Sequence, residues 1–137
     1  MSRAGNLGGM RPLIHPSIED ITVEGILHAL ADPVRAAIYV ELASSACPNI
    51  CADFLKISDR NIPKSTLSQH FRALREAGLV RSERSGVEMH NTSRCAEVDK
   101  RFPGLLPAIM NACRIQAADC VRATKRKQAA AKRQAAA

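Results

Sequence analysis

The stretch from Lys64 to Val80, KSTLSQHFRALREAGLV, carries the side chains best suited to recognising a ligand. Leu67, Phe71 and Leu74 repeat at helical spacing, which predicts the buried stripe of an amphipathic helix. The other face holds hydroxyl, amide and imidazole groups with arginines nearby, in place of the Glu and Lys of a solvated surface. Such groups suit the edges of bases and the oxygens of phosphates. We therefore predict a helix that fits the DNA major groove and stops at Gly78.

The charge distribution favours a polyanionic partner. The chain carries 20 Lys and Arg against 13 Asp and Glu, a net charge of +7. Residues 56–84 hold seven basic and three acidic residues, a local charge of +4 on the segment that contains the polar-faced helix. Residues 122–137 hold six basic and no acidic residues, which leaves +1 for residues 1–121. A basic segment of this kind is typical of a nucleic-acid-binding surface.

Two short helices are predicted ahead of this segment. Thr22 can cap a first helix, in which apolar residues recur at helical spacing as far as Leu30. Asp32 followed by Pro33 is a strong start signal for a second helix, which continues the apolar stripe to about Ala43. The two helices are expected to meet at a tight joint.

A third helix is predicted from Asn49 to Ile57, with Asn49 placed to cap it and with Phe54 among its apolar residues. Residues 58–63 contain Asp, Asn and Pro, which are turn residues. A short helix, a turn and the polar-faced helix thus follow one another. This order predicts a helix-turn-helix with a slightly long turn.

A β-hairpin is predicted after the polar-faced helix. The segments Leu79 to Glu83 and Val87 to Asn91 flank Ser85-Gly86, which is a hairpin signal. Such a hairpin is a wing, whose basic side chains could reach the sugar-phosphate backbone or a minor groove. A plain solvated hairpin is the alternative.

These patterns assign DNA-binding roles residue by residue. Ser68 and Gln69 are expected to approach base edges. His70 is interpreted as a DNA donor and not as a metal ligand. The other residues expected to contact bases or phosphates are Ser65 and Thr66. Those expected to hold the sugar-phosphate backbone are Lys64, Arg72, Arg81 and Arg84.

Composition indicates one mostly α-helical domain. The chain has 137 residues, 46% of them hydrophobic but only 3% aromatic, so its core must come from Leu, Ile, Val and Ala packed between helices. The expected divisions are a flexible arm at 1–16, a DNA-binding domain at 17–121, to which the resemblance described below adds dimerisation, and a basic Ala-rich tail at 122–137. The tail is expected to be a frayed helix or unstructured. It either attracts DNA without regard to sequence or serves only as a solubilising tail.

The sequence favours a cytoplasmic protein with reduced thiols. Five cysteines form no even disulfide framework, and the N-terminus has no secretory pattern. No segment approaches the roughly 20 apolar residues that a membrane helix needs. A Gly-rich phosphate loop, a nucleophile elbow and an HExxH motif are all absent from the sequence, so no enzyme activity is predicted.

Three blocks in this order give the chain a family resemblance. ALADPVR at Ala29 to Arg35, LSQHFRALREAGLV at Leu67 to Val80 and the hairpin around Gly86 resemble the ArsR/SmtB family of winged helix-turn-helix repressors. The resemblance covers roughly residues 22–115. It implies a homodimer whose first and last helices form the interface, with one recognition helix per subunit offered to a half-site of palindromic promoter DNA.

By the same resemblance, the final helix runs from about Lys100 to Ala118 or beyond. Its apolar stripe includes Leu106, Ile109 and Met110, and Pro107 near its start places the helix proper from about Leu106. Such a stripe needs a partner surface. A second subunit would supply one, and packing onto the same chain is the alternative.

The sequence departs from the metal-sensing members of this family. Those members carry a CVCDL-type box or Asp, His and Glu ligands on the last helix, whereas ICADFL here keeps only Cys51, and the last helix has no histidine. Cys113 and Cys120 stand about 10 Å apart along a helix, too far to share one ion with sulfur bonds near ~2.3 Å. No metal site within one chain and no cofactor is predicted.

Cys47 and Cys51 are the redox candidates. A helix-terminal position can favour the thiolate of Cys51, and a reversible disulfide between the two would strain the support of the recognition helix and lower DNA affinity. Two other interpretations stay open. The cysteines are small buried hydrophobes, or they bind arsenite or a soft metal together with Cys95 or another subunit's sulfur. Beyond the thiols, the protein has no dedicated small ligand or has one that the sequence does not disclose.

The sequence therefore predicts a homodimeric transcriptional repressor that binds double-stranded promoter DNA and is released by an inducing signal, of which thiol oxidation is one candidate. The alternatives are a repressor that responds to arsenite or a soft metal, and a winged-helix module that binds a protein.

Overall fold

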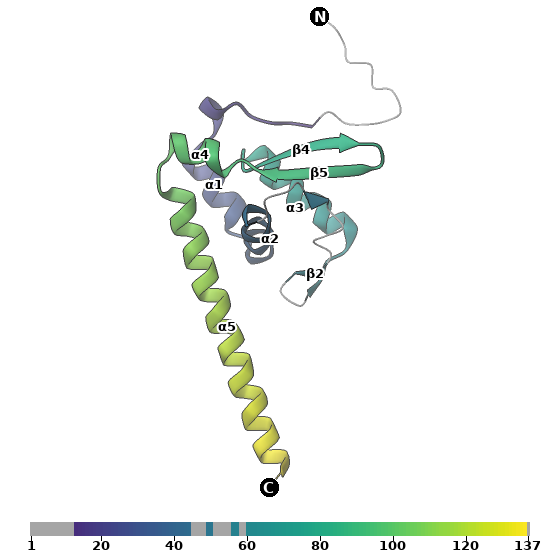
Figure 1. Ribbon diagram of the computed structural model, residues 1–137, viewed down its shortest axis with the longest axis vertical. Coiled ribbons are helices and arrows are strands. Elements are labelled where there is room, and N and C mark those ends of the chain that lie inside the picture. The colour runs from purple at the N-terminus through teal and green to yellow at the C-terminus, as the bar shows by residue number, and fades with distance from the viewer. Residues whose placement is uncertain (1–12, 45–48, 51–55, 58–59, 137) are drawn as a thin grey trace, which may run out of the picture.

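The computed structural model describes residues 13–44, 49–50, 56–57 and 60–136 (Figure 1). Its elements follow one another as a short 3-10 helix η2 (Ile18–Asp20), α1 (Val23–Leu30), α2 (Pro33–Ala43), β1 (Asn49–Ile50), β2 (Lys56–Ile57), β3 (Arg60–Asn61), α3 (Lys64–Glu76), β4 (Val80–Ser85), β5 (Glu88–Ser93), α4 (Cys95–Arg101) and α5 (Leu105–Ala136). Helices α1 to α4 and the hairpin form a body from which α5 projects (Figure 1). The predicted class, mostly helical with a small hairpin, is confirmed.

The first two helices begin and end where the sequence predicts. Gly25 donates its backbone N–H to Thr22 Oγ1 at 3.0 Å, and Arg35 donates its backbone N–H to Asp32 Oδ1 at 2.9 Å. Pro33 occupies the first position of α2, where its missing N–H costs nothing. Both predicted caps are confirmed.

The third predicted helix, from Asn49 to Ile57, is wrong at both of its described ends. Asn49 and Ile50 pair as β1 with β5, and Lys56 and Ile57 pair as β2 with β3. An isolated helix of about nine residues is marginal in water, so the backbone partners offered by nearby strands decide the conformation at these ends. Residues 51–55 lie outside the described part of the chain.

The wing is a three-stranded sheet with the order β1-β5-β4, so β4 is an edge strand. The predicted hairpin is confirmed, but its turn lies one residue later than predicted. Ser85 pairs with Glu88, which makes Gly86 and Val87 the turn, and Gly86 has a φ of 62°.

One hydrophobic core joins α1, α2, α3, the base of the wing and the start of α5. Its fully buried side chains are Ile21, Ile26, Ile38, Tyr39, Leu42, Leu67, Phe71, Leu74, Leu79, Val80, Val98 and Leu106. Ten of these twelve are aliphatic, in accord with the predicted core composition. Tyr39 is the polar exception. Its hydroxyl lies 2.9 Å from Ser93 Oγ, and burial raises its pKa to about 12.

The C-terminal part contains two helices where one was predicted. Phe102 to Gly104 separate α4 from α5, and Gly104 has a φ of 84°, which stops a helix. The segment 122–136, predicted as a frayed helix or a tail, is a continuation of α5. None of the described helices is long and apolar enough to cross a membrane.

Candidate nucleic-acid interface

The core fixes α3 along its inner side. Leu67, Phe71 and Leu74 are each at most 1% exposed, as their spacing predicts. The helix stops at Gly78, whose φ of 84° is in the left-handed region, and Leu79 returns its N–H to the carbonyl of Leu74 at 3.0 Å. The chain then enters β4 at once, so α3 and the wing are joined by a short, ordered connection.

A buried chain of hydrogen bonds ties α3 to the wing. Arg75 Nη1 donates to Ser82 Oγ at 3.3 Å, and Ser82 Oγ donates to Asn91 Oδ1 at 2.6 Å. Ser82 and Asn91 are 2% and 0% exposed, so the hydrogen bond between them lies inside the body. These two hydrogen bonds link the last turn of α3 to both strands of the hairpin.

The outer face of α3 is polar and open to solvent. Ser65, Ser68, Gln69 and Arg72 are exposed, and Thr66 is half-buried. Lys64, the first residue of the helix, is also exposed. These six side chains are therefore open to solvent at least in part, whereas their contacts with DNA stay a prediction.

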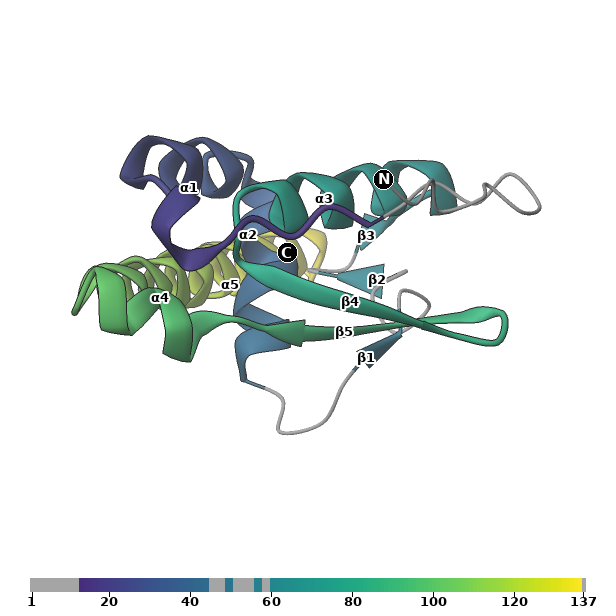
Figure 2. The same cartoon turned by 90° about the horizontal axis from the view of Figure 1, so that it is seen from above.

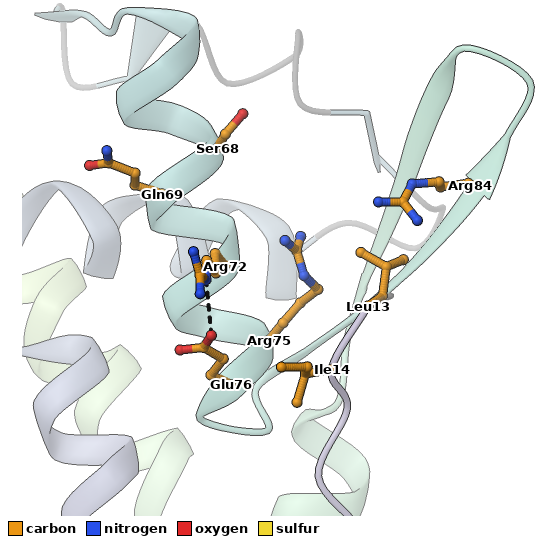
Figure 3. Close-up of a pocket in the computed structure, with 8 residues that line it drawn as sticks. All are labelled: Leu13, Ile14, Ser68, Gln69, Arg72, Arg75, Glu76 and Arg84. Atoms are coloured by element: carbon orange, nitrogen blue, oxygen red, sulfur yellow. Dashed lines mark hydrogen bonds and ion pairs between the residues drawn. The ribbon is translucent and has the colours of Figure 1, made fainter. Parts of the chain in front are cut away.

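A groove of about 460 Å³ lies between α3 and the wing (Figure 3). Its lining residues are Leu13, Ile14, Ser68, Gln69, Arg72, Arg75, Glu76 and Arg84. Three arginines and one glutamate give the groove a positive balance. Arg72 Nε lies 3.0 Å from Glu76 Oε1, so the single carboxylate partly offsets one guanidinium (Figure 3).

The wing contributes one of its two predicted arginines to this groove. Along β4, Val80, Ser82 and Arg84 share one side because strand residues alternate, and Arg84 lines the groove. Arg81 lies on the other side of the hairpin, where its Nη2 is 3.8 Å from Glu97 Oε1 on α4. The structure therefore brings Arg84 together with α3 and places Arg81 apart from it.

The prediction that His70 belongs to the outward polar face is wrong. His70 is 8% exposed, and Arg35 Nε donates to its Nδ1 at 3.3 Å. Burial lowers the pKa of His70 below its usual value of 6.5. The Asp32 carboxylate has the next largest effect and raises the pKa in part. The physical reason lies in the spacing. His70 follows Leu67 by three residues and precedes Leu74 by four, so it belongs to the buried stripe.

The end of the segment predicted as a flexible arm, residues 1–16, makes ordered contacts that the sequence did not predict. Ser82 donates its backbone N–H to His15 Nε2 at 2.9 Å, and Arg94 Nη1 donates to the Pro16 carbonyl at 2.8 Å. In the view from above, residues 13–16 run beside β4 and α3 (Figure 2). The apolar pair Leu13 and Ile14 is the one signal that could have indicated docking.

The cysteines proposed for sensing fall into two groups. Cys47 and Cys51 lie outside the described residues. Cys95, Cys113 and Cys120 are free thiols. Within 13–44, 49–50, 56–57 and 60–136, no group of three His, Cys, Asp or Glu side chains is arranged to hold a metal ion.

Comparison with known proteins finds helix-turn-helix regulators that match part of the chain. A helix-turn-helix domain family matches residues 30–83. The chain is 42% identical over 65 residues to the HTH-type transcriptional repressor SmtB of Mycobacterium tuberculosis, in both strain CDC 1551 / Oshkosh and strain ATCC 25618 / H37Rv. The match covers 47% of this chain, and the chain spans 44% of the length of these relatives.

Solved structures with a similar arrangement include two regulators. The ArsR-like transcriptional regulator from Rhodococcus sp. RHA1 has a TM-score of 0.49 at 25% identity, with 78% of this chain and 91% of that chain covered. Reduced HlyU from Vibrio cholerae N16961 has a TM-score of 0.46 at 22% identity, with 58% and 87% covered. The helix-turn-helix match and the SmtB relative, taken with the helices and wing described above, support an ArsR/SmtB-type winged helix-turn-helix regulator, and that family comprises DNA-binding transcriptional regulators and not enzymes.

Proposed function

We propose that the chain is a sequence-specific DNA-binding repressor of transcription. The observation that carries the proposal is the groove in which Ser68 and Gln69 of α3 lie with Arg84 of the wing. The helix has 13 residues, which is about 20 Å, and a major groove about 12 Å wide admits it. The hydroxyl and amide would then meet base edges, while the guanidinium meets a phosphate.

The roles of the remaining residues follow from their positions. Lys64, Ser65 and Thr66 occupy the first turn of α3, where backbone N–H groups also favour a phosphate. Arg72 would contact the sugar-phosphate backbone of the DNA next to the base that Gln69 contacts. His70 is assigned to the support of α3 through Arg35, and Arg81 to the contact with Glu97.

The repressor is proposed to act as a homodimer. Apolar side chains are exposed on the first helix, where Leu27 is 50% exposed, and on the last, where Ile115 and Val121 are 55% and 53% exposed. Helix faces of this kind need a partner surface, and a second copy of the chain would supply it. Two recognition helices would then address two half-sites of promoter DNA. With such a target, the proposed location is the cytoplasm.

The groove assignment is tested with two variants on two DNAs. The operator is first selected from a pool of duplexes, and binding is then measured on this operator and on a random duplex of equal length. Gln69→Ala should reduce the preference for the operator by about 1–3 kcal/mol, because it removes a base contact. Arg84→Ala should weaken binding to both DNAs alike, because phosphates carry no sequence information.

Equal losses on both DNAs for Gln69→Ala would contradict the assignment of base reading to α3. If the wild-type chain selects no duplex at all, the remaining candidate is a module that binds a protein through the same face.

The release signal is a separate part of the proposal. Oxidation of Cys47 and Cys51 to a disulfide should abolish operator binding, and dithiothreitol should restore it. Cys47→Ser protein should then be indifferent to the oxidant. If wild-type binding is also indifferent to diamide, the redox signal is excluded, and arsenite or a soft metal bound by thiolates is the alternative to titrate.

A further inference from the structure

The outer part of α5 is a free-standing charged helix. The helix runs for 32 residues, and within residues 114–136 every side chain is exposed. It touches the body at its start, where Leu106 is buried, and its outermost bond to the body runs from Arg114 Nη2 to Ser44 Oγ at 3.2 Å. At about 1.5 Å per residue, the 22 residues beyond Arg114 extend roughly 33 Å from the body (Figure 1).

The basic residues of this segment lie on one side of the helix. With about 3.6 residues per turn, five of the six fall within an arc of about 120°. These five, here called the basic stripe, are Arg122, Lys125, Arg126, Lys132 and Arg133. Lys127 falls outside the arc. Because the segment is helical, five of its six basic side chains lie on one face.

The stripe has little internal compensation. Arg122 forms an ion pair with Asp119, one turn earlier. From residue 120 to the end, the sequence contains no Asp or Glu, so the other four cations have no carboxylate on their own part of the helix. Like charges spaced three and four residues apart repel one another on a helix. A stripe of this kind is therefore best suited to an external polyanion.

The side of the helix away from the stripe argues against a membrane as that polyanion. Beyond Val121, the residues other than Lys and Arg are Ala, Thr and Gln. An amphipathic helix at a membrane surface needs Leu, Phe or Trp to bury opposite its basic face. Small and polar residues form the helix well but leave nothing to insert into lipid.

The length of the stripe matches a short piece of duplex. From Arg122 to Arg133 the helix advances about 16.5 Å. Along a duplex, this distance corresponds to about five base pairs at 3.4 Å each, with two phosphates for each pair.

We propose that the basic stripe of α5 binds the sugar-phosphate backbone of duplex DNA without reading its sequence, apart from the contacts of α3. The choice of DNA as the polyanion rests on the proposed function. The stripe adds a salt-sensitive, sequence-independent contribution to affinity, which concentrates the protein on DNA before α3 finds its operator.

Two variants of the full chain test the stripe. The first neutralises four cations by Lys125→Gln, Arg126→Gln, Lys132→Gln and Arg133→Gln. The second keeps composition and net charge but moves two guanidiniums off the stripe, by exchanging Arg126 with Ala131 and Arg133 with Gln134. Gln, Lys and Arg have similar helix propensities, and circular dichroism verifies that α5 stays helical in both.

Binding to a labelled random 30-base-pair duplex is measured from 50 to 200 mM KCl. The slope of the logarithm of the association constant against the logarithm of salt changes by about 0.9 for each phosphate that the protein no longer neutralises. The slope of the neutralised variant should therefore be shallower by about 3–4, and that of the exchange variant by about 2. An unchanged slope in the neutralised variant overturns the proposal. An exchange variant with the same slope as the wild type also overturns the proposal, because net charge alone would then explain the salt dependence of binding.

Two further arms separate the possible failures. Vesicles of phosphatidylserine and phosphatidylcholine are offered at the same salt, and tighter binding to them than to DNA overturns the choice of partner. Operator preference is measured in the same samples. Preference that persists beside an unchanged slope means that only the stripe has failed, whereas DNA binding without any operator preference means that the proposed repressor function has failed.

Discussion

The two helices α3 and α5 both present basic faces to solvent, but they are held in different ways. The inner side of α3 is buried at Phe71, and its end is tied to the wing by the bond from Arg75 to Ser82. By contrast, α5 is anchored only over its first turns, up to the bond from Arg114 to Ser44, and its basic stripe stands clear of the body.

This difference in anchoring predicts a difference in what each helix can recognise. A base contact discriminates only if its donor and acceptor stay within hydrogen-bond range, which needs a fixed side chain on a fixed backbone. Attraction to phosphates needs only charge near the duplex. The fixed helix is thus suited to reading sequence and the projecting helix to adding affinity.

The largest effect is expected where a left-handed glycine is packed against the core. Gly78 after α3 and Gly104 before α5 both have a φ of 84°. A methyl group on Gly78 would meet Ile21, with its Cβ 2.6 Å from Cδ1, whereas nothing lies within 4 Å of the corresponding position at Gly104. Gly104→Ala should cost about 1–2 kcal/mol from φ alone. Gly78→Ala should cost about 1–3 kcal/mol more, because Ile21 is buried and cannot move aside.

Urea denaturation followed by circular dichroism measures both free energies of unfolding. Equal losses in the two variants would mean that Ile21 yields without cost, and that the end of α3 is no more firmly held than the start of α5.

A smaller effect is expected from pH at the segment beside α3. Burial lowers the pKa of His15 below 6.5, with Arg81 the next cause, and Ser82 donates to the neutral ring. The unfolded chain then binds more protons than the folded chain as the pH falls. This contribution to stability is complete above pH 6.5 and is lost as the pH falls through the lower pKa of the folded state.

His15→Gln serves as the variant for this test, because an amide oxygen accepts a hydrogen bond but does not titrate. Between pH 7.5 and 5.5 the wild type should lose about 0.5–1.5 kcal/mol more than the variant, the worth of one hydrogen bond. His70 also has a lowered pKa, but it is present in both proteins and cancels in the difference. The Ser82 amide signal should follow the same titration by NMR, and a signal indifferent to pH would refute the role of His15.

Local sequence signals predicted the parts of the fold that are fixed locally. Thr22 and the pair Asp32-Pro33 each act within one turn of helix, so their caps could be read directly. Gly78 is similar, since its φ is required by the helix end that it forms. The exposure of the polar residues of α3 could be predicted from helical spacing alone.

The errors arose where contacts with a distant part of the chain determine the local conformation or the burial of a side chain. The pairing of Asn49 with Asn91 depends on an available strand 42 residues away. His70 looked like a surface donor because of its chemistry, but Arg35 supplies a partner inside the body. Its position three residues after Leu67 was enough to indicate burial, but the prediction followed the residue type instead of the spacing. The distinction between Arg84 and Arg81 likewise needed the register of the hairpin.

The smallest effect is expected from the one carboxylate in the groove of α3. Glu76 lies 3.0 Å from Arg72 on the next turn, and both side chains are well exposed at 45% and 62%. An exposed pair of this kind contributes at most about 0.5 kcal/mol to stability, so Glu76→Gln should barely change the free energy of unfolding. It should nevertheless strengthen binding to operator and random duplex alike by roughly 2-fold at low salt, because Arg72 is released toward phosphates and a repulsive charge is removed. Glu19→Gln makes the same chemical change outside the groove and should leave DNA affinity unaltered. If the two variants bind DNA with the same affinity, then releasing the Arg72 guanidinium from Glu76 does not help binding, and Arg72 does not contact DNA.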